Sequence, residues 1–238
     1  MAETSQQILV ELKPLGKASY KKVLMNNHGV QEPCFGVAIS ELKKIQKRIK
    51  RDYQLALDLY DTGNYDAMYL AGLIADDARM TKQDLQRWVE KAYAGSLPGT
   101  TVPSVSAGSP HGLAMARKWI ESPKPMIAAA GWATWSALVS VKPDEELDLE
   151  ELRALLQRVQ KTIHQAPDAV RYQMNTFAIA LGSFVAALTD EVMKAGEKIG
   201  TVTADLGNNS CQIPYIPAYI QKVKDHGSIG KKRKSAKC

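Results

Sequence analysis

The segment Pro125–Val141 constrains the fold more than any other part of the chain. Its seventeen residues carry no charged side chain, and about half of them are Ala, Gly, Ser or Thr. A membrane-spanning helix needs about twenty strongly apolar residues, and a surface helix needs a charged face. The segment therefore predicts a helix enclosed by protein on all sides, whose small side chains let neighbouring helices approach closely.

Two other stretches share this character. Residues 172–189 and the shorter stretch 67–75 also lack charged side chains. Each uncharged stretch follows charged amphipathic segments, which lie at residues 40–62, 111–121 and 149–165. A charged outer helix and an uncharged inner helix that recur at roughly 40 residues are typical of helical-repeat solenoids. The alternative is a single irregular helical bundle.

Strand signals are scarce. Only residues 101–105 and 201–204 read as extended runs, so the chain is expected to be all-α. Residues 95–108 are rich in Gly, Pro, Ser and Thr, and this composition predicts a long loop with a functional role or high flexibility. We expect a single solenoid domain over residues 1–229, followed by a basic C-terminal tail over residues 230–238.

The cysteines and the N-terminus bear on the cellular compartment. Cys34, Cys211 and Cys238 form no CxxC pair, and the first residues carry no secretory signal pattern. The four histidines have no metal-ligand spacing, and the sequence contains no GxxxxGK, GxGxxG, HExxH or GxSxG motif. These observations predict a cytoplasmic monomer that uses no metal and no cofactor and does not enter a membrane.

Positive charge gathers toward both ends of the chain. The net charge is +6, with ten basic and two acidic residues in 13–51, and seven basic residues and one acidic residue in 220–238. This asymmetry is typical of a polyanion-binding protein, although charge runs are often only solvated faces. Within residues 40–51 the apolar side chains Leu42, Ile45 and Ile49 share one face, and the cations cover the others. The side chains expected to face phosphates are Lys43, Lys47, Arg48, Lys50 and Arg51, together with Lys231, Lys232, Arg233 and Lys234 of a tail predicted to be disordered.

Three stretches carry a resemblance to a known family. They are residues 36–45 (GVAISELKKI), 55–63 (LALDLYDTG) and 69–76 (YLAGLIAD), with further similarity at 88–89 and 169–177. They resemble the bacterial DNA alkylation repair family, the AlkD-like DNA glycosylases. The resemblance implies a HEAT-like superhelix whose cationic concave face holds duplex DNA. It also implies metal-free excision of N3- or N7-alkylated purines, with the lesion left in the stack and a carboxylate stabilising positive charge on the sugar.

The residues that carry the family's chemistry are replaced in this chain. Active members have a motif of the type Trp-Asp-x-x-Asp shortly after the position of Trp88, where this chain has YAGSLPGTT over residues 93–101. The family's arginine falls near residues 128–130, which are all Ala. Glu90 is the nearest carboxylate and the candidate substitute for the missing aspartate. Phe177 matches the family's aromatic residue on the last inner helix, and Arg171 occupies a basic position common in these repeats, so both are expected to contact DNA.

These observations predict a protein that binds duplex DNA and releases N7-methylguanine little faster than that base is lost spontaneously. The alternative is a non-enzymatic HEAT-repeat scaffold that binds structured nucleic acid or a protein partner.

Overall fold

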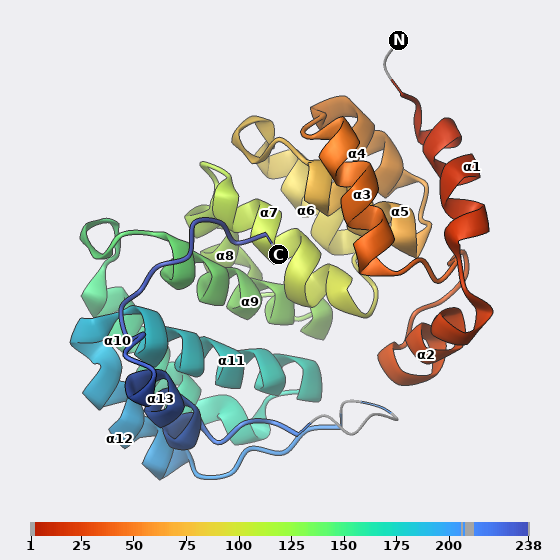
Figure 1. Cartoon of the computed structure of the whole chain (residues 1–238). Coiled ribbons are helices and arrows are strands. Elements are labelled where there is room, and N and C mark those ends of the chain that lie inside the picture. Colours follow the sequence, from red (N-terminus) through yellow and green to blue (C-terminus); the bar gives the residue numbers. More distant parts are fainter. Residues whose placement is uncertain (1–2, 206, 208–211, 238) are drawn as a thin grey trace. The chain divides into compact units, whose positions relative to one another are not determined.

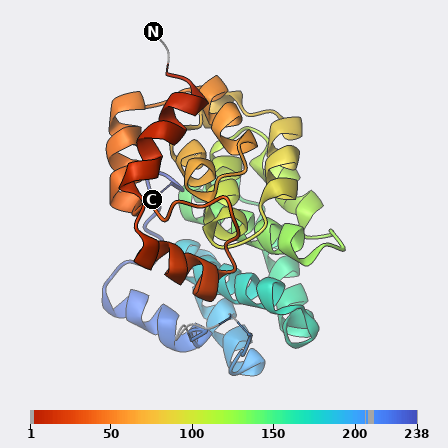
Figure 2. The same cartoon turned by 90° about the vertical axis from the view of Figure 1, so that its right-hand side faces the viewer.

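A computed structural model describes residues 3–205, 207 and 212–237 of the chain. Within these residues every regular element is a helix, and pairing of the β type is limited to one isolated bridge between Gly16 and Val37 (Figures 1 and 2). The all-α prediction is confirmed: of the two extended runs in the sequence, 101–105 is helical and 201–204 lies outside any regular element. Across the same residues no single helix is long and apolar enough to cross a membrane, although one sharply bent pair, Asp168–Phe184 with Ala186–Ile199, passes that test jointly.

The helices form two compact units, which are described separately. Unit 1 is built on Met1–His111 and includes Lys237, and unit 2 is built on Gly112–Asp205 and later residues through Ala236. The single domain expected over residues 1–229 stays a prediction. The helices of unit 1 are α1 (Ser5–Leu15), α2 (Ala18–His28), α3 (Ile39–Ile49), α4 (Tyr53–Asp61), α5 (Tyr65–Ile74), η1 (Asp77–Arg79), α6 (Lys82–Lys91), η2 (Leu97–Thr101) and α7 (Val102–Gly108).

Unit 2 contains the two longest helices among the described residues, α9 without a charged side chain and α11 with charged side chains only in its first turn. Its elements are α8 (Gly112–Trp119), α9 (Pro125–Val141), η3 (Asp144–Glu146), α10 (Leu149–Thr162), η4 (Ile163–Gln165), α11 (Asp168–Phe184), η5 (Ala186–Leu188), α12 (Thr189–Ile199) and α13 (Ile216–Asp225). Helices α9 and α11 pack against each other, and the rings of Trp132 and Phe177 meet with centroids 5.3 Å apart. Both rings have no exposed surface, so they lie in the centre of this unit's core.

Small residues let the inner helices pack closely, as the sequence predicts. A Cβ atom added at Gly131 of α9 would lie 2.6 Å from the backbone nitrogen of Ile120, so only glycine fits this approach. In unit 1, a Cβ at Gly72 of α5 would collide with the Cγ2 atom of Thr101. All ten residues of α5 are buried. The predicted enclosed helices over Pro125–Val141 and within residues 67–75 are confirmed.

Residues 95–108 correct the sequence analysis, because most of this expected loop is helical. Residues Leu97–Thr101 form one π-helical turn and Val102–Gly108 form α7, whose residues from Val102 to Ala107 are all buried. Pro103 lies in the first turn of α7, where the missing N–H group has no helical partner to lose. The hydroxyl of Ser104 donates to the carbonyl of Thr101 at 3.0 Å. Burial therefore overrides the loop-like composition of this segment.

Candidate nucleic-acid interface

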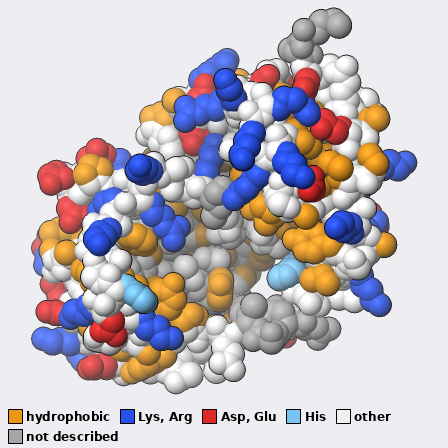
Figure 3. All heavy atoms as spheres, viewed as in Figure 1, with side chains coloured by type: hydrophobic (Ala, Val, Ile, Leu, Met, Phe, Trp, Pro, Cys, Tyr) orange, Lys and Arg blue, Asp and Glu red, His pale blue; other side chains and the backbone are white. Residues whose placement is uncertain are grey.

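Helix α3 presents a cationic surface above an apolar seam. Leu42 and Ile45 are 2% and 3% exposed and attach the helix to the core of unit 1. The helix ends at Ile49 and is capped by Lys50, which has a positive φ of 66°, uncommon for a residue with a side chain. Figure 3 shows Lys and Arg side chains gathered over this part of the molecule. This is the surface at which the sequence predicts phosphate contacts.

The cations of α3 differ in their partners. No ion pair joins Lys43, Lys47, Lys50 or Arg51 to the described part of the chain, and Lys47, Lys50 and Arg51 are exposed. Arg48 behaves differently, because its guanidinium contacts Glu3 at 3.0 Å and Glu11 at 2.6 Å. Lys43, Lys47 and Lys50 therefore lie on α3 and its cap without ion pairs to the described residues. Arg51 follows the cap, where burial raises the pKa of Asp77 and the Arg51 charge opposes that rise.

Arg48 connects α3 to α1 through its ion pair with Glu11. Its hydrogen bonds to Glu11 of α1 hold the pKa of that carboxyl below its usual value, and burial opposes this effect. A guanidinium that binds two carboxylates is already neutralised, and a phosphate would have to displace them. The structure therefore separates Arg48 from the other predicted DNA-binding cations.

Arg171 and Phe177 both belong to unit 2 and have structural partners. The Arg171 guanidinium donates to the carbonyls of Thr203 at 2.7 Å and Ala166 at 2.9 Å, and it lies 3.5 Å from Asp168. Phe177 is completely buried. A side chain without exposed surface offers nothing for DNA to contact, so the predicted role of Phe177 is corrected to core packing.

The C-terminal tail also corrects the prediction of disorder for its described residues. The backbone N–H groups of Gly230 and Arg233 donate to the carbonyls of Ser183 and Ser140, near the carboxyl ends of α11 and α9. The Lys232 ammonium lies 2.8 Å from Asp144 and donates to the carbonyl of Val139 at 2.9 Å. Carbonyls in the last turn of a helix lack intrahelical partners, and the helix dipole favours cations there. The tail therefore caps two inner helices of unit 2.

The other cations of the tail differ in whether they have a partner in the protein. The Arg233 guanidinium lies over the ring of Phe184, 5.4 Å from its centre. Lys231 and Lys234 are exposed and form no ion pair with the described residues. In unit 1, the Lys237 ammonium contacts Asp77 at 2.7 Å and the carbonyl of Ala75 at the end of α5 at 2.8 Å.

Glu90 lies on the exposed face of α6. Its carboxylate accepts a hydrogen bond from Gln86 one turn earlier, at 2.7 Å. Trp88 of the same helix points inward and stacks on Tyr60 with centroids 4.1 Å apart. The catalytic role of Glu90 stays a prediction, and its exposed position beside Gln86 does not favour that role.

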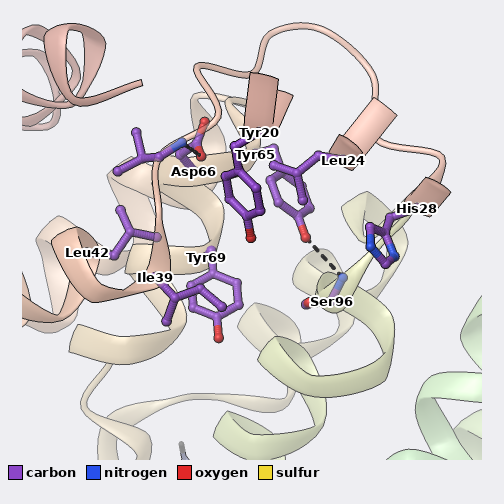
Figure 4. A pocket seen from close by; sticks show the side chains of 10 residues that line it. Tyr20, Leu24, His28, Ile39, Leu42, Tyr65, Asp66, Tyr69 and Ser96 are labelled. Carbon is purple, nitrogen blue, oxygen red and sulfur yellow. Dashed lines mark hydrogen bonds between the residues drawn. The ribbon is translucent and has the colours of Figure 1, made fainter. Parts of the chain in front are cut away.

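A small cavity within unit 1 was not predicted from the sequence. It measures about 80 Å³ and lies where α2, α3, α5 and the residue before η2 converge (Figure 4). Its lining combines phenol, imidazole and hydroxyl groups with aliphatic walls. The lining residues are Tyr20, Leu24, His28, Val37, Ile39, Leu42, Tyr65, Asp66, Tyr69 and Ser96.

Asp66 is the one carboxylate in this lining, and it is fully engaged. It is 1% exposed and accepts hydrogen bonds from the backbone N–H groups of Phe35 at 2.6 Å, Gly36 at 3.1 Å and Val37 at 2.8 Å. Three such bonds satisfy most of the acceptor capacity of the carboxylate and fix the segment before α3 against α5. A lone Asp next to the uncharged stretch 67–75 is the sequence signal that could have drawn attention to it.

Burial favours the neutral forms of the two phenols and the thiol near Asp66. Burial, followed by the charge of Asp66, raises the pKa of Tyr20, and burial raises the pKa of Tyr65. Burial and the charge of Asp66 also raise the pKa of the Cys34 thiol to about 12. Among the described residues, no group of three His, Cys, Asp or Glu side chains is arranged to hold a metal ion.

Known proteins share both the sequence and the fold of this chain. Residues 8–189 match the family model described as DNA alkylation repair enzyme. The uncharacterized proteins Lin0241 of Listeria innocua and Lmo0209 of Listeria monocytogenes are each 29% identical to the chain over 228 residues, which cover 93% of this chain and 98% of each relative.

A solved structure extends the comparison to three dimensions. It comes from work on a new family of proteins related to the HEAT-like repeat DNA glycosylases with affinity for branched DNA structures. It superposes with a TM-score of 0.91 at 33% identity and covers 99% of this chain and 100% of its own. The expected HEAT-like helical-repeat fold is thereby confirmed. Sequence and fold together establish that this chain belongs to the DNA alkylation repair enzyme family.

Proposed function

We propose that the protein binds DNA through the unpaired cations of α3 and its cap, Lys43, Lys47, Lys50 and Arg51. The observation that carries this proposal is the absence of ion pairs at these four residues within the described chain, next to the fully paired Arg48. Cations that form no ion pair within the protein can neutralise phosphates without breaking one. The related structure, whose family has affinity for branched DNA, supports the same conclusion.

We also propose that binding occurs without efficient excision of N3- or N7-alkylated purines. Excision needs a fixed negative charge beside the sugar. Asp66 is 1% exposed and accepts three backbone N–H donors, and Glu90 is exposed on α6 beside Gln86. Residues 93–101, which replace the family's acidic motif, contain no carboxylate. The proposed activity is therefore recognition of DNA structure.

The binding test compares a linear duplex, a three-way junction and a four-way junction of equal length by fluorescence anisotropy at several salt concentrations. We expect tighter binding to the junctions. For each phosphate neutralised, the logarithm of affinity should fall by about 0.9 per logarithmic unit of salt. Affinities that are independent of salt would overturn the proposed contact surface.

The excision test follows release of N7-methylguanine from methylated duplex DNA. The expected rate is close to that of DNA alone, and the Glu90→Gln variant should behave in the same way. Release far above the protein-free rate would contradict the proposal. Loss of that release in Glu90→Gln would then identify Glu90 as the catalytic group.

A further inference from the structure

We propose that Lys237 is a positioning residue for DNA binding: by occupying the carboxylate of Asp77, it leaves the neighbouring Arg51 available to a phosphate. This inference rests on the proposed DNA binding and adds to it a residue that acts through another side chain. All three residues belong to unit 1.

The carboxyl end of α5 brings two distant segments of the chain together. The backbone N–H of Asp52 donates to the carbonyl of Ile74, the last residue of α5, at 2.9 Å. The Lys237 ammonium donates to the next carbonyl, that of Ala75, at 2.8 Å, and it lies 2.7 Å from the carboxylate of Asp77. The segment that follows α3 and the tail lysine therefore meet at one helix end.

Asp77 is the carboxylate for which two cations compete. Its side chain is 22% exposed, and that of Lys237 is 15% exposed. Burial raises the pKa of Asp77, and the charges of Lys237 and Arg51 both oppose that rise. A largely buried carboxylate is destabilising unless a cation lies beside it, so one of the two cations has to serve it.

Lys237 takes this place, and Arg51 is left outside. Arg51 directly precedes Asp52, so its side chain begins beside the same helix end. It is nevertheless exposed and forms no ion pair with the described residues. The Lys237 ammonium satisfies both the Asp77 carboxylate and a carbonyl at the end of α5, where the helix dipole also favours a cation. The Arg51 guanidinium therefore remains in water, where a phosphate can reach it.

Arg48 shows what pairing does to an arginine of this surface. Its guanidinium is already held by two carboxylates, which a phosphate would have to displace. Without Lys237, Arg51 should bind Asp77 in the same way and stop neutralising a phosphate. Lys237 therefore sets how many cations the surface beside α3 offers to DNA.

The test is a double-mutant cycle in which the affinity for a four-way junction is measured at several salt concentrations. Lys237→Met should lower affinity roughly three- to eightfold at about 0.1 M salt and reduce the salt slope by about 0.9, the value for one lost phosphate contact. Arg51→Gln should have the same effect. Adding Lys237→Met to Arg51→Gln should cause no further loss, because the side chain through which Lys237 acts is already absent.

Rescue and control variants separate this mechanism from a loss of charge or of folding. Asp77→Asn keeps the shape of the side chain and removes the charge that would capture Arg51. Lys237→Met combined with Asp77→Asn should therefore regain the wild-type affinity and salt slope. Lys234→Met removes one positive charge from an exposed residue of the same tail and should leave both quantities nearly unchanged. Circular dichroism at the assay temperature verifies that each variant is folded.

Three results would overturn the inference. An undiminished affinity in Arg51→Gln does so without any Lys237 variant, which keeps the test decisive even if Lys237→Met fails to fold. A full additional loss on adding Lys237→Met to Arg51→Gln would show that Lys237 contacts DNA itself, and an absence of rescue by Asp77→Asn would show that Asp77 does not capture Arg51.

Failure of the wild-type protein to bind any DNA would refute the proposed function. Salt-dependent binding to which Arg51 contributes nothing would refute only this inference.

Discussion

Two basic segments of this chain have similar composition and different surroundings. Helix α3 and the two residues after it carry Lys43, Lys47, Lys50 and Arg51 without ion pairs to the described residues, whereas Lys232 and Lys237 of the C-terminal segment are held by helix ends and carboxylates. The difference arises because the tail passes the carboxyl ends of inner helices, whose carbonyls and dipoles attract cations. A run of Lys and Arg is therefore available to an external anion only where the fold leaves it unpaired.

The largest expected effect is on DNA affinity. The double variant Lys47→Glu with Lys50→Glu should weaken binding on the order of 100-fold at low salt and reduce the salt slope by roughly 2, since two phosphate contacts are lost. Anisotropy with linear and branched probes measures both quantities. The charge-matched comparison is Lys231→Glu with Lys234→Glu, which reverses the two tail cations that are also exposed and without ion pairs to the described residues. A much smaller loss would restrict the contact surface to the α3 segment, and an equal loss would contradict that restriction.

Lys237→Met should destabilise unit 1 by about 2 kcal/mol at neutral pH, because it removes the partner of a largely buried carboxylate. Burial already raises the pKa of Asp77, and Lys237 opposes that rise. A carboxyl whose folded pKa is raised contributes stability that is lost as pH increases through that pKa. Without Lys237 the pKa of Asp77 should rise further. The stability lost in Lys237→Met relative to the wild type should therefore be larger at pH 7 than near pH 4.

Urea unfolding at both pH values tests this prediction, with Lys234→Met as the exposed control. If Lys237→Met lowers the free energy of unfolding by the same amount at both pH values, loss of the ion pair is not the cause of the destabilisation. Replacing both partners, by Lys237→Met with Asp77→Leu, should restore much of the lost stability, since no buried charge is then left unpaired.

A smaller effect is expected for Lys232. Lys232→Met should lower the free energy of unfolding by about 1 kcal/mol, because the contacts with Asp144 and the Val139 carbonyl are only partly shielded from water. Lys231→Met removes the same charge from an exposed side chain and should leave stability unchanged. Equal unfolding midpoints for the two variants would contradict the capping role of the tail.

The smallest effect is expected for Arg48. Arg48→Ala should lower DNA affinity by less than about twofold, whereas Lys47→Ala should lower it severalfold, because only Lys47 is free to neutralise a phosphate. The stability lost in Arg48→Ala should stay below about 1 kcal/mol, since the pair is exposed. The pKa of Glu11 is lowered in the folded protein. The Arg48–Glu11 pair therefore stabilises the fold above the ordinary carboxyl pKa, and this stabilisation is lost as the pH falls through the pKa of Glu11 in the folded protein. A stronger binding defect in Arg48→Ala than in Lys47→Ala would reverse the assignment.

The candidate site was only partly predictable from the sequence. The spacing of Leu42, Ile45 and Ile49 identified α3 as a helix with a cationic face, because helical periodicity is a local property. The cavity could not be predicted, since Tyr20, Tyr65 and Ser96 come from separate segments that only the packing of unit 1 brings together. Asp66 was missed for the same reason, as its three donors lie about thirty residues earlier in the chain.

The sequence by itself determined where the buried helices lie. A helix such as Pro125–Val141 has no charged face, so only an environment of other helices can enclose it. Tertiary structure decided the fate of residues 95–108, because burial stabilised helices in a segment whose composition favours a loop. It also decided which cations are free, because Arg48 meets Glu3 and Glu11, and Lys232 meets Asp144, only after the chain has folded. Local patterns fix burial and periodicity, whereas charge pairing depends on contacts between residues far apart in sequence.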